Sequence, residues 1–298
     1  MHAPLLVAFL AGLGGMWGWG ISEFATKKSV DRVGAISSLV WAHVFGTVIL
    51  LAVLLTSLFV IKAPAMFPTE WTEWLGLLFF GSLQTAVYYF AYKGFESGQV
   101  AVLSPIFASF AGWVALISVF FRGEVLGPGL ASALMLIFGG VFLINVDLAG
   151  LREGRVRLKR VPGLKEILIA TVLATGWTLG WGQFTIGKDW LVYATFMFIA
   201  MTLSAFVLAW VNRVTLLQGT SGAWQFLWLV GIGEALAYLA ISLGYATTPY
   251  TSVVAILSGA SSLPTILLAW IFLKERMAFI QMVGAAVIIV GIVLVSSS

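Results

Sequence analysis

One carboxylate, Glu234, lies in the middle of a long apolar run, in the stretch LVGIGEALAYLA. A charged side chain at the centre of a bilayer is costly, and this run contains no basic residue that would neutralise it. The side chain must therefore face a polar cavity, hold a proton, or bind a cation or an amine. A carboxyl group that exchanges a proton inside a membrane is also what proton coupling requires. The alternative is a structural glutamate that is hydrogen-bonded to serine or tyrosine.

Two short segments combine glycine with tryptophan, and they read GGMWGWG and GWTLGWG. Small residues let membrane helices approach closely, whereas tryptophan offers a large aromatic face. Trp17 and Trp19 project about 200° apart on a helix, so one can face a central cavity while the other packs or meets lipid. Trp19 recurs as Trp181 in the second segment. The expected cavity-lining tryptophans are Trp17, Trp19, Trp177 and Trp181. A close-packing face with interfacial tryptophans is the alternative.

Further polar side chains lie in other apolar runs and supply hydrogen-bonding groups. Pro105 and Pro264 interrupt intrahelical hydrogen bonds, which frees carbonyl groups where a helix lines a cavity. Serines beside them add hydroxyl groups, although serine in a membrane helix often bonds only its own backbone. The remaining candidate binding residues are Gln84, Tyr88, Tyr238, Ser104, Ser109, Ser258 and Ser262.

Four other titratable residues have structural explanations. Glu23 precedes Lys27 by four residues, so an ion pair at the membrane surface is expected. Glu124 and Glu275 each head an apolar run, where an acidic group suits the N-terminal helix dipole. His43 lies inside a run, and a hydrogen bond to a neighbouring carbonyl group explains it better than a proton relay.

The composition defines the elements that position these residues. Of the 298 residues, 61% are hydrophobic and only 9% are charged, and the mean hydropathy is +1.05. A soluble domain carries roughly 25% charged residues, so this is an all-α integral membrane protein. Continuous apolar runs of about 20 residues favour transmembrane helices over a barrel. We expect ten helices, at residues 3–24, 35–61, 71–92, 97–121, 125–146, 163–186, 190–211, 224–246, 250–273 and 277–296.

The same composition argues against several classes of chemistry. The chain contains no cysteine and only two histidines, so neither a metal site nor a cofactor is expected. No GxxxxGK[ST] motif is present, which excludes ATP hydrolysis by this chain. A nucleophile with a base, or paired carboxylates at mid-membrane depth, would indicate an intramembrane enzyme, and neither is found. The basic residues cluster in loops, which is typical of membrane topology and gives no reason to expect a nucleic acid partner.

The chain repeats itself once. Matching residues, with their separations, are Trp19 and Trp181 (162), Gln84 and Glu234 (150), and Glu124 and Glu275 (151). The separation falls where the first half has longer loops, so the register is coherent. We divide the chain into a first repeat at 1–146, a charged linker at 147–162 and a second repeat at 163–298. Five helices per repeat make the second copy enter the membrane inverted, which is typical of alternating-access transporters with a midplane site.

The terminal pattern of each half, together with the glycine–tryptophan segments, carries a family resemblance. The first half ends in ISVFFRGEVLGPGLASALMLIFGGVFLINV and the second in LPTILLAWIFLKERMAFIQMVGAAVIIVGIVLV. Each has a glutamate just past one helix and late glycines in the next. Over essentially its whole length, the chain resembles the drug/metabolite transporter superfamily, of the EamA-domain type. The resemblance implies ten helices in two five-helix repeats around a central cavity, and transport of small metabolites, often export of amino acids or related solutes.

We interpret the protein as a multi-pass transporter of the cytoplasmic membrane, working as a monomer or a homodimer. Its expected substrate is a small neutral or zwitterionic metabolite, such as an amino acid or an amine, exported by alternating access with Glu234 as the proton-coupling group. No lysine or arginine lies at mid-membrane depth, which argues against phosphorylated substrates. A facilitator of free sugars or other solutes is the alternative, and a channel or structural membrane subunit is a third interpretation.

The charge distribution and the family resemblance favour opposite orientations. Loops on the side of the termini hold 3 of the 16 lysine and arginine residues, and the opposite side holds the other 13. The positive-inside rule therefore favours termini outside the cell. The resemblance instead implies cytoplasmic termini, so the sequence leaves both orientations open.

Overall fold

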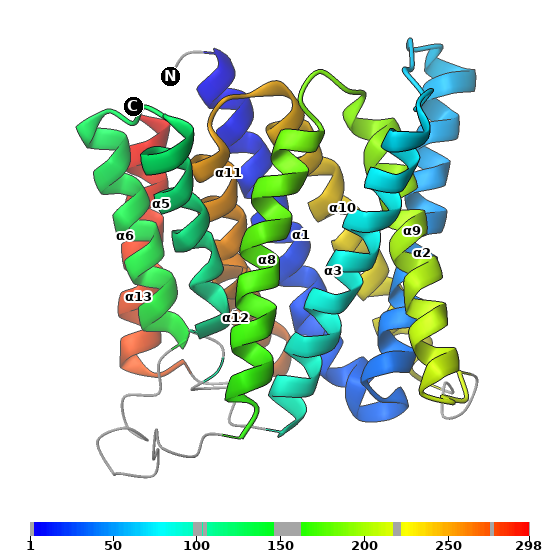
Figure 1. Ribbon diagram of the computed structural model, residues 1–298. Coiled ribbons are helices and arrows are strands. Elements are labelled where there is room, and N and C mark those ends of the chain that lie inside the picture. Colours follow the sequence, from blue (N-terminus) through cyan, green and yellow to red (C-terminus); the bar gives the residue numbers. More distant parts are fainter. Residues whose placement is uncertain are drawn as a thin grey trace.

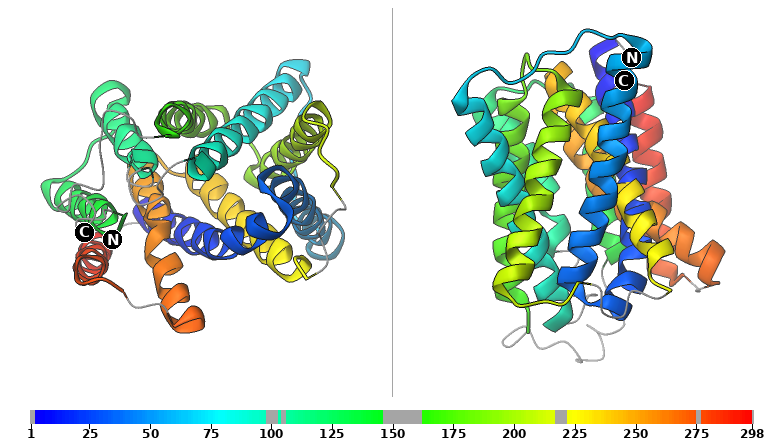
Figure 2. Two further views of the ribbon diagram at one scale, coloured as in Figure 1. Left: turned by 90° about the horizontal axis from the view of Figure 1, so that it is seen from below. Right: turned by 90° about the vertical axis from the view of Figure 1, so that its right-hand side faces the viewer.

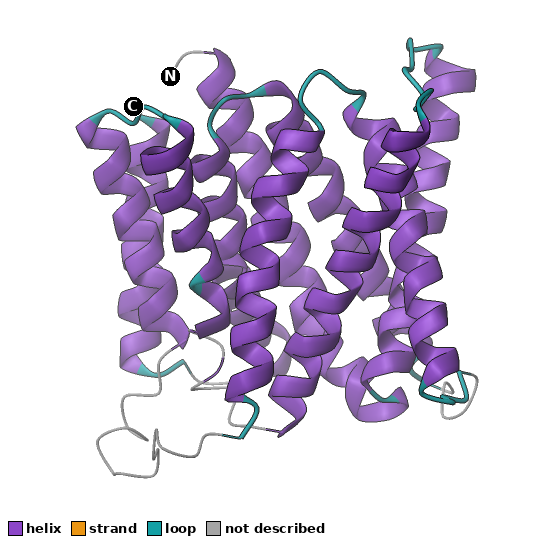
Figure 3. Ribbon diagram, viewed as in Figure 1, coloured by secondary structure: helices purple, strands orange, loops and turns teal. Residues whose placement is uncertain are grey.

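The protein is a helical bundle in the computed structural model (Figure 1; Figure 3). The structure describes residues 3–97, 103, 106–145, 162–216, 222–274 and 277–297, and these ranges contain no strand. The α-helices are α1 (Ala3–Val33), α2 (Ala35–Thr56), α3 (Trp71–Ser97), α5 (Phe110–Arg122), α6 (Pro128–Asn145), α8 (Leu164–Phe184), α9 (Trp190–Val211), α10 (Trp224–Thr247), α11 (Thr251–Ser258), α12 (Ser262–Leu273) and α13 (Phe279–Ser296). A π-helical turn at Ser57–Ile61 extends α2, and a 3₁₀ turn at Gly259–Ser261 joins α11 to α12.

Within the part of the chain that the structure describes, the ten expected transmembrane helices correspond to nine long helices and one shorter one. Within the described residues, nine helical segments are long and apolar enough to cross a membrane. The shorter apolar segment is Ile106–Arg122, which a turn at Ser109 interrupts. The sequence predicts this helix at 97–121, and much of its first third lies outside the described residues. The all-helical membrane architecture is therefore confirmed.

The two halves of the chain run in opposite directions through the bundle. Both termini lie at one edge, the terminal edge, whereas α6 ends and α8 begins at the opposite edge, which we call the linker edge (Figure 1). The first helix of the first half, α1, therefore runs towards the linker edge, and the first helix of the second half, α8, runs away from it. This antiparallel relation is what an odd number of helices per repeat predicts.

Helix α1 extends to Val33, well beyond the end predicted at residue 24. Its basic last turns contact the beginning of α10: the Arg32 guanidinium lies 4.5 Å from the Phe226 ring centroid and donates a hydrogen bond of 2.9 Å to the Gly222 carbonyl. The helix ends at Val33, and Gly34 follows it with a positive φ of +79°. The prediction was too short because charged residues end an apolar run without ending the helix.

The ninth predicted helix, at 250–273, is broken near its middle. Ala260 in the joining turn has non-helical dihedrals, with φ −81° and ψ 20°. Pro264 lacks the N–H group that would donate to the carbonyl four residues earlier, which explains the break. The proline ring fills the space beside Gly20 of α1, where a Cβ atom would lie 2.3 Å from Pro264 Cγ.

Glycine lets α1 and α10 meet backbone to backbone. A Cβ atom at Gly18 would lie 2.6 Å from the Ala237 nitrogen, and one at Gly233 would lie 2.5 Å from the Gly18 carbonyl oxygen. These two helices lie at the centre of the bundle, with α2 and α9 towards one side and α6 and α13 towards the other (Figure 2). Because Glu234 directly follows Gly233, this contact places its carboxylate against α1.

Candidate substrate-binding site

The Glu234 carboxylate is buried at the meeting point of α1, α3 and α10. The residue is only 3% exposed. Ser22 Oγ donates a hydrogen bond of 2.9 Å to its Oε1 atom, and the Tyr88 hydroxyl donates one of 2.5 Å to its Oε2 atom. Two hydroxyl groups from the first half therefore hold a carboxylate from the second half, and neither brings a compensating charge.

Aromatic rings enclose Tyr238, which lies one helical turn after Glu234 on α10. The Tyr238 hydroxyl donates a hydrogen bond of 3.4 Å to the Tyr88 hydroxyl. Its ring meets Trp19, Trp177 and Phe198 edge to face, with centroid distances of 6.1, 5.8 and 5.3 Å. The hydrogen-bonded carboxylate thus has a box of aromatic rings beside it.

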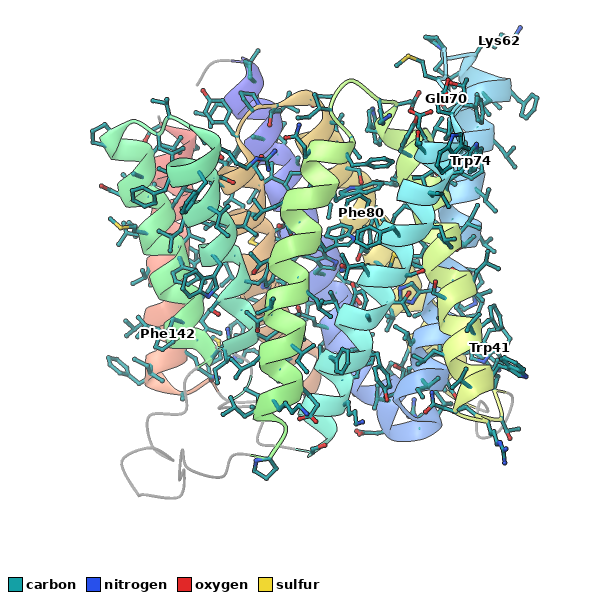
Figure 4. All side chains as sticks on the ribbon, in the orientation of Figure 1. Trp41, Lys62, Glu70, Trp74, Phe80 and Phe142 are labelled. Atoms are coloured by element: carbon teal, nitrogen blue, oxygen red, sulfur yellow. The ribbon has the colours of Figure 1, made fainter. Side chains whose placement is uncertain are left out.

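Two tryptophans of α8 form the wall of this box towards the terminal edge. Trp177 and Trp181 stack with their ring centroids 5.9 Å apart and their planes 14° apart. Trp177 Nε1 donates to the Phe80 carbonyl at 3.0 Å, and Trp181 Nε1 donates to Ser242 Oγ at 3.2 Å. Phe80 lies between the two edges of the bundle (Figure 4). Because both indole N–H groups are already bonded, this pair offers its ring faces rather than donors.

Three polar atoms near the carboxylate are buried without a hydrogen-bond partner: Trp19 Nε1, His43 Nε2 and Gln84 Oε1. His43 Nδ1 lies 2.7 Å from the Leu39 carbonyl oxygen. A carbonyl oxygen only accepts, so Nδ1 holds the proton and Nε2 of the neutral ring is an acceptor. The His43 ring contacts Tyr88 at 5.5 Å and Phe198 at 5.2 Å between centroids. Unsatisfied buried polar groups are rare and costly, so these atoms are candidates for contact with a ligand.

The structure brings together seven of the predicted site residues. They are Trp19, Gln84, Tyr88, Trp177, Trp181, Glu234 and Tyr238. Ser22 and His43 join them, although neither was among the predicted binding residues. Ser22 lies three residues after Trp19 and hence on the same helix face, a signal that would have found it. The His43 carbonyl bond is present as predicted, but its contact with Tyr88 depends on how α2 packs.

Trp17 lies apart from this cluster. It is 46% exposed on the outer surface and borders an apolar groove of about 360 Å³ that Trp190 and Leu239 also line. Trp17 and Trp19 therefore point to different faces of α1, as their spacing predicts.

The predicted serines also lie away from Glu234. Ser109 Oγ donates to the Ile106 carbonyl at 2.6 Å, and Ser258 Oγ donates to the Ala255 carbonyl at 3.2 Å. Ser262 Oγ accepts a hydrogen bond of 3.2 Å from Asn145 Nδ2. Two of these hydroxyls thus bond their own helix backbone, as serines in membrane helices often do. Ser104 and Pro105 lie outside the described residues.

Glu23 bonds to the broken ninth helix. Ser261 Oγ donates to its Oε1 atom at 2.8 Å, and Thr265 Oγ1 donates to its Oε2 atom at 3.0 Å. The sequence predicts a pair with Lys27, whose side chain lies outside the described part of the structure. Glu23 thus joins α1 to the second half by a second carboxylate contact.

Glu124 caps α11 in the other half of the chain instead of heading α6. Its Oε2 atom accepts a hydrogen bond of 3.1 Å from the Ser252 backbone nitrogen, and Oε1 accepts one from Ser252 Oγ. Burial raises the pKa of this carboxyl group above its usual value, against the lowering effect of the Ser252 hydrogen bonds. The other predicted head group, Glu275, lies outside the described residues.

A fully paired carboxylate lies at the terminal edge. Glu73, in the first turn of α3, accepts hydrogen bonds from the Lys188 ammonium and from the Tyr193 hydroxyl, the latter at 2.7 Å. Its Oε2 atom also accepts from the Thr69 nitrogen at 2.9 Å. Nearby, Arg122 donates to Gln183. These contacts join the two halves at that edge, and Glu70 marks the same region in Figure 4.

The residues near Glu234 do not form a metal site. Among the described residues, no group of three or more histidine, cysteine, aspartate or glutamate side chains could hold a metal ion.

Neither the groove beside Trp17 nor a second cavity, between α2 and α3, includes Glu234 in its lining. The rings of Trp177, Trp181 and Tyr238 are buried at the centre of the bundle.

An inverted pair of helical repeats is typical of multi-pass membrane transporters for small solutes. The EamA-like transporter family model matches residues 6–146 and 164–297. The chain therefore belongs to the EamA-like transporter family, which confirms the resemblance carried by its sequence motifs.

Solved structures share this fold. A crystal structure described simply as "Crystal structure of protein" is 16% identical to the chain, covers 97% of it over 97% of its own length, and superposes with a TM-score of 0.76. No curated protein matches the chain significantly.

Proposed function

We propose that this protein is a secondary transporter for a small solute with a protonated amine, such as a neutral amino acid or a simple amine. The observation that supports this proposal is Glu234, a buried carboxylate that accepts hydrogen bonds from two hydroxyl groups and has no cationic partner among the described residues. A buried charge without a cationic partner is costly. An ammonium group on the solute, or a proton, would supply the missing positive charge.

The free polar atoms around Glu234 also favour a donor-rich ligand. Gln84 Oε1 and His43 Nε2 are acceptors without partners, and Trp19 Nε1 is the one donor among the three orphaned atoms. An ammonium group has three donors and no acceptor, so it complements this set. The rings of Trp19, Trp177 and Tyr238 suit the apolar remainder of such a solute and can contact its charge through their faces.

The same acceptors disfavour anionic substrates. The lysine and arginine residues in the described spans lie near helix ends, for example Lys93 and Arg122, and none lies beside Glu234. A solute of net negative charge, such as a phosphate ester or a carboxylic acid without an amine, would therefore lack a cationic partner at the central site and would meet a like charge.

Transport then proceeds by alternating access between the two inverted halves. The solute amine displaces a hydroxyl contact of Glu234 on binding, and a proton takes its place when the solute leaves. This exchange makes the protein a proton-coupled exporter in the cytoplasmic membrane, as a monomer or a homodimer, without catalytic activity or a cofactor.

Flux into proteoliposomes tests the proposal. Wild type and Glu234→Gln are compared with a mixed pool of neutral amino acids and amines, with and without a pH gradient. Glu124→Gln is the matched control, because it neutralises a carboxylate outside the central cluster. We expect gradient-driven flux in wild type and in the control, and none in Glu234→Gln. Equal flux in all three proteins would make Glu234 structural and would contradict the proposal.

A facilitator of free sugars is the second candidate, and the stacked Trp177 and Trp181 pair favours it. Aromatic faces pack well against the apolar face of a sugar ring. The same liposomes distinguish the two functions. Sugar flux that does not change with the pH gradient or with the Glu234→Gln substitution would favour the facilitator. Currents that far exceed carrier rates would instead indicate a channel.

A further inference from the structure

A cavity of about 280 Å³ opens at the linker edge, between the beginning of α2 and the ends of α3 and α9. Its walls include Ile36 and Leu39 of α2, and Tyr89 and Tyr92 of α3, and Lys93 and Asn212 contribute polar groups. A cavity of this size accommodates a ligand as large as an aromatic amino acid, and most of its wall is apolar or aromatic. This composition is typical of small-molecule sites.

Two contacts join the wall of this cavity to Tyr88 and His43, which lie in the central cluster. The ring of Tyr92, in the cavity wall, lies 6.0 Å from the ring of Tyr88, whose hydroxyl binds Glu234. The Leu39 carbonyl, also from the wall, accepts the hydrogen bond from His43. One layer of side chains therefore separates this cavity from the site at the centre.

By contrast, aromatic side chains fill the path from Glu234 towards the terminal edge. Trp181 is fully buried and contacts Phe80 and Phe184, with centroid distances of 5.7 and 5.9 Å. Beyond these rings, the Glu73 and Lys188 pair joins the two halves. In this structure, the central site is therefore nearest to water on the linker side.

The cavity and the central cluster contain charged groups of opposite sign. Lys93 follows Tyr88 by five residues on α3, about 7.5 Å along the helix axis. Its ammonium lies 5.6 Å from the Tyr89 ring centroid, in the wall of the cavity. The central cluster has a carboxylate and unpaired acceptors, whereas this cavity has a cation and an amide. The two sites thus suit opposite ends of one zwitterionic solute.

We propose that the cavity between α2, α3 and α9 is a second solute site, in which Lys93 and Asn212 bind a carboxylate while Tyr89 and Tyr92 contact the apolar part of the solute. This assignment rests on the proposed function, because the solute then moves past Tyr92 to place its amine on Glu234. A solute without a carboxylate binds the centre but not this cavity.

Cysteine protection tests the second site, and the natural chain contains no cysteine. The variant Ile36→Cys in detergent-solubilised protein is treated with a hydrophilic thiol reagent in the presence of one of three probes. L-phenylalanine has both charges, 3-phenylpropionate has only the carboxylate, and phenethylamine has only the amine. Met66→Cys, exposed at the terminal edge, is the control for direct effects of a probe on the reagent.

We expect L-phenylalanine and 3-phenylpropionate to slow modification of Ile36→Cys, phenethylamine to leave it unchanged, and Met66→Cys to be unaffected. Adding Lys93→Met should weaken the protection by about ten-fold, as losing one contact to a charged group predicts. No reaction of Ile36→Cys, no protection by either carboxylate, or protection that survives Lys93→Met would overturn the assignment.

The Glu234→Gln variant separates this assignment from the proposed function. We expect protection of Ile36→Cys by 3-phenylpropionate to persist in Glu234→Gln, because the carboxylate site does not use Glu234. Protection together with flux that is insensitive to Glu234→Gln would keep the cavity site and refute the central amine site. Flux that depends on Glu234 without any protection would refute the cavity site alone.

Discussion

Two carboxylates, the partly exposed Glu73 at the terminal edge and the buried Glu234 at the centre, have opposite surroundings. Glu73 receives a lysine ammonium, a tyrosine hydroxyl and backbone N–H groups. Glu234 receives two hydroxyl groups and no cation. The same chain can therefore neutralise a carboxylate completely where it joins the two halves. The missing charge at Glu234 is thus a local feature of the centre, and this is what a site for an exchangeable cation requires.

Removing the two charges separately gives the largest expected contrast. Glu234→Gln should lower proteoliposome flux by at least about 30-fold, since losing one partner of a buried charge pair costs roughly 2–5 kcal/mol. Glu73→Gln should leave flux within about three-fold of wild type, because Glu73 touches no part of the central cluster. A similar loss of flux in both variants would break the distinction between the two carboxylates.

Removing one tyrosine hydroxyl from each carboxylate sharpens the comparison. Tyr88→Phe deletes the donor to Glu234 and should lower apparent substrate affinity by about ten-fold or more, as expected for a hydrogen bond to a charged group. Tyr193→Phe deletes the corresponding donor to Glu73 and should leave affinity unchanged. The measurement is the concentration dependence of initial flux. A larger effect from Tyr193→Phe would show that the terminal edge controls binding.

The free energy of unfolding should change in the reverse order, with the larger loss at the Glu73 and Lys188 pair and the smaller change at Glu234. Lys188→Met breaks the pair with Glu73 and should destabilise the detergent-solubilised protein by roughly 1 kcal/mol, because the pair is partly exposed and therefore screened. Glu234→Gln should change stability less, or raise it, since it removes an uncompensated buried charge. Thermal unfolding followed by tryptophan fluorescence measures both. A strongly destabilised Glu234→Gln protein would mean that this carboxylate holds the fold together.

The smallest effect is expected from Glu124, a third carboxylate that lies outside the spans. Burial raises its pKa above the usual 4.5 in the folded protein, so the folded state binds the proton more tightly than the unfolded state. Its contribution to stability is therefore largest at low pH and is lost as pH rises from about 4.5 through the raised pKa. Glu124→Gln should flatten that part of the stability–pH curve. An unchanged curve would contradict the shift.

The fold was predictable from sequence because hydrophobic length dictates membrane helices. Hydrophobic length does not determine where a helix ends or whether it is broken, and the predicted helices differed from the structure in these respects. Residues such as Arg32 remain helical because α10 supplies partners for them, and Pro264 breaks a helix whose apolar run continues through the break. Inversion of the halves followed from the odd helix count alone.

The candidate site was predictable where a residue was exceptional in its own run. Glu234 is a charge among apolar residues, and Trp19 and Trp181 recur in both halves, so these stood out. His43 and Ser22 did not, because their role depends on contacts between helices that are distant in sequence. Ser258 was selected for its hydroxyl group, yet that hydroxyl bonds its own helix.

The glycine contact between α1 and α10 restricts how the two halves can move. At Gly18 and Gly233 the two backbones touch, so separating these helices would leave a void that no side chain can fill. In the proposed alternating access, the halves would tilt about this line of contact, since tilting keeps the backbones together at one depth. Such tilting would widen one edge of the bundle while it narrows the other. Within the proposed mechanism, a chain held together at this contact opens one edge at a time, which prevents leakage across the membrane.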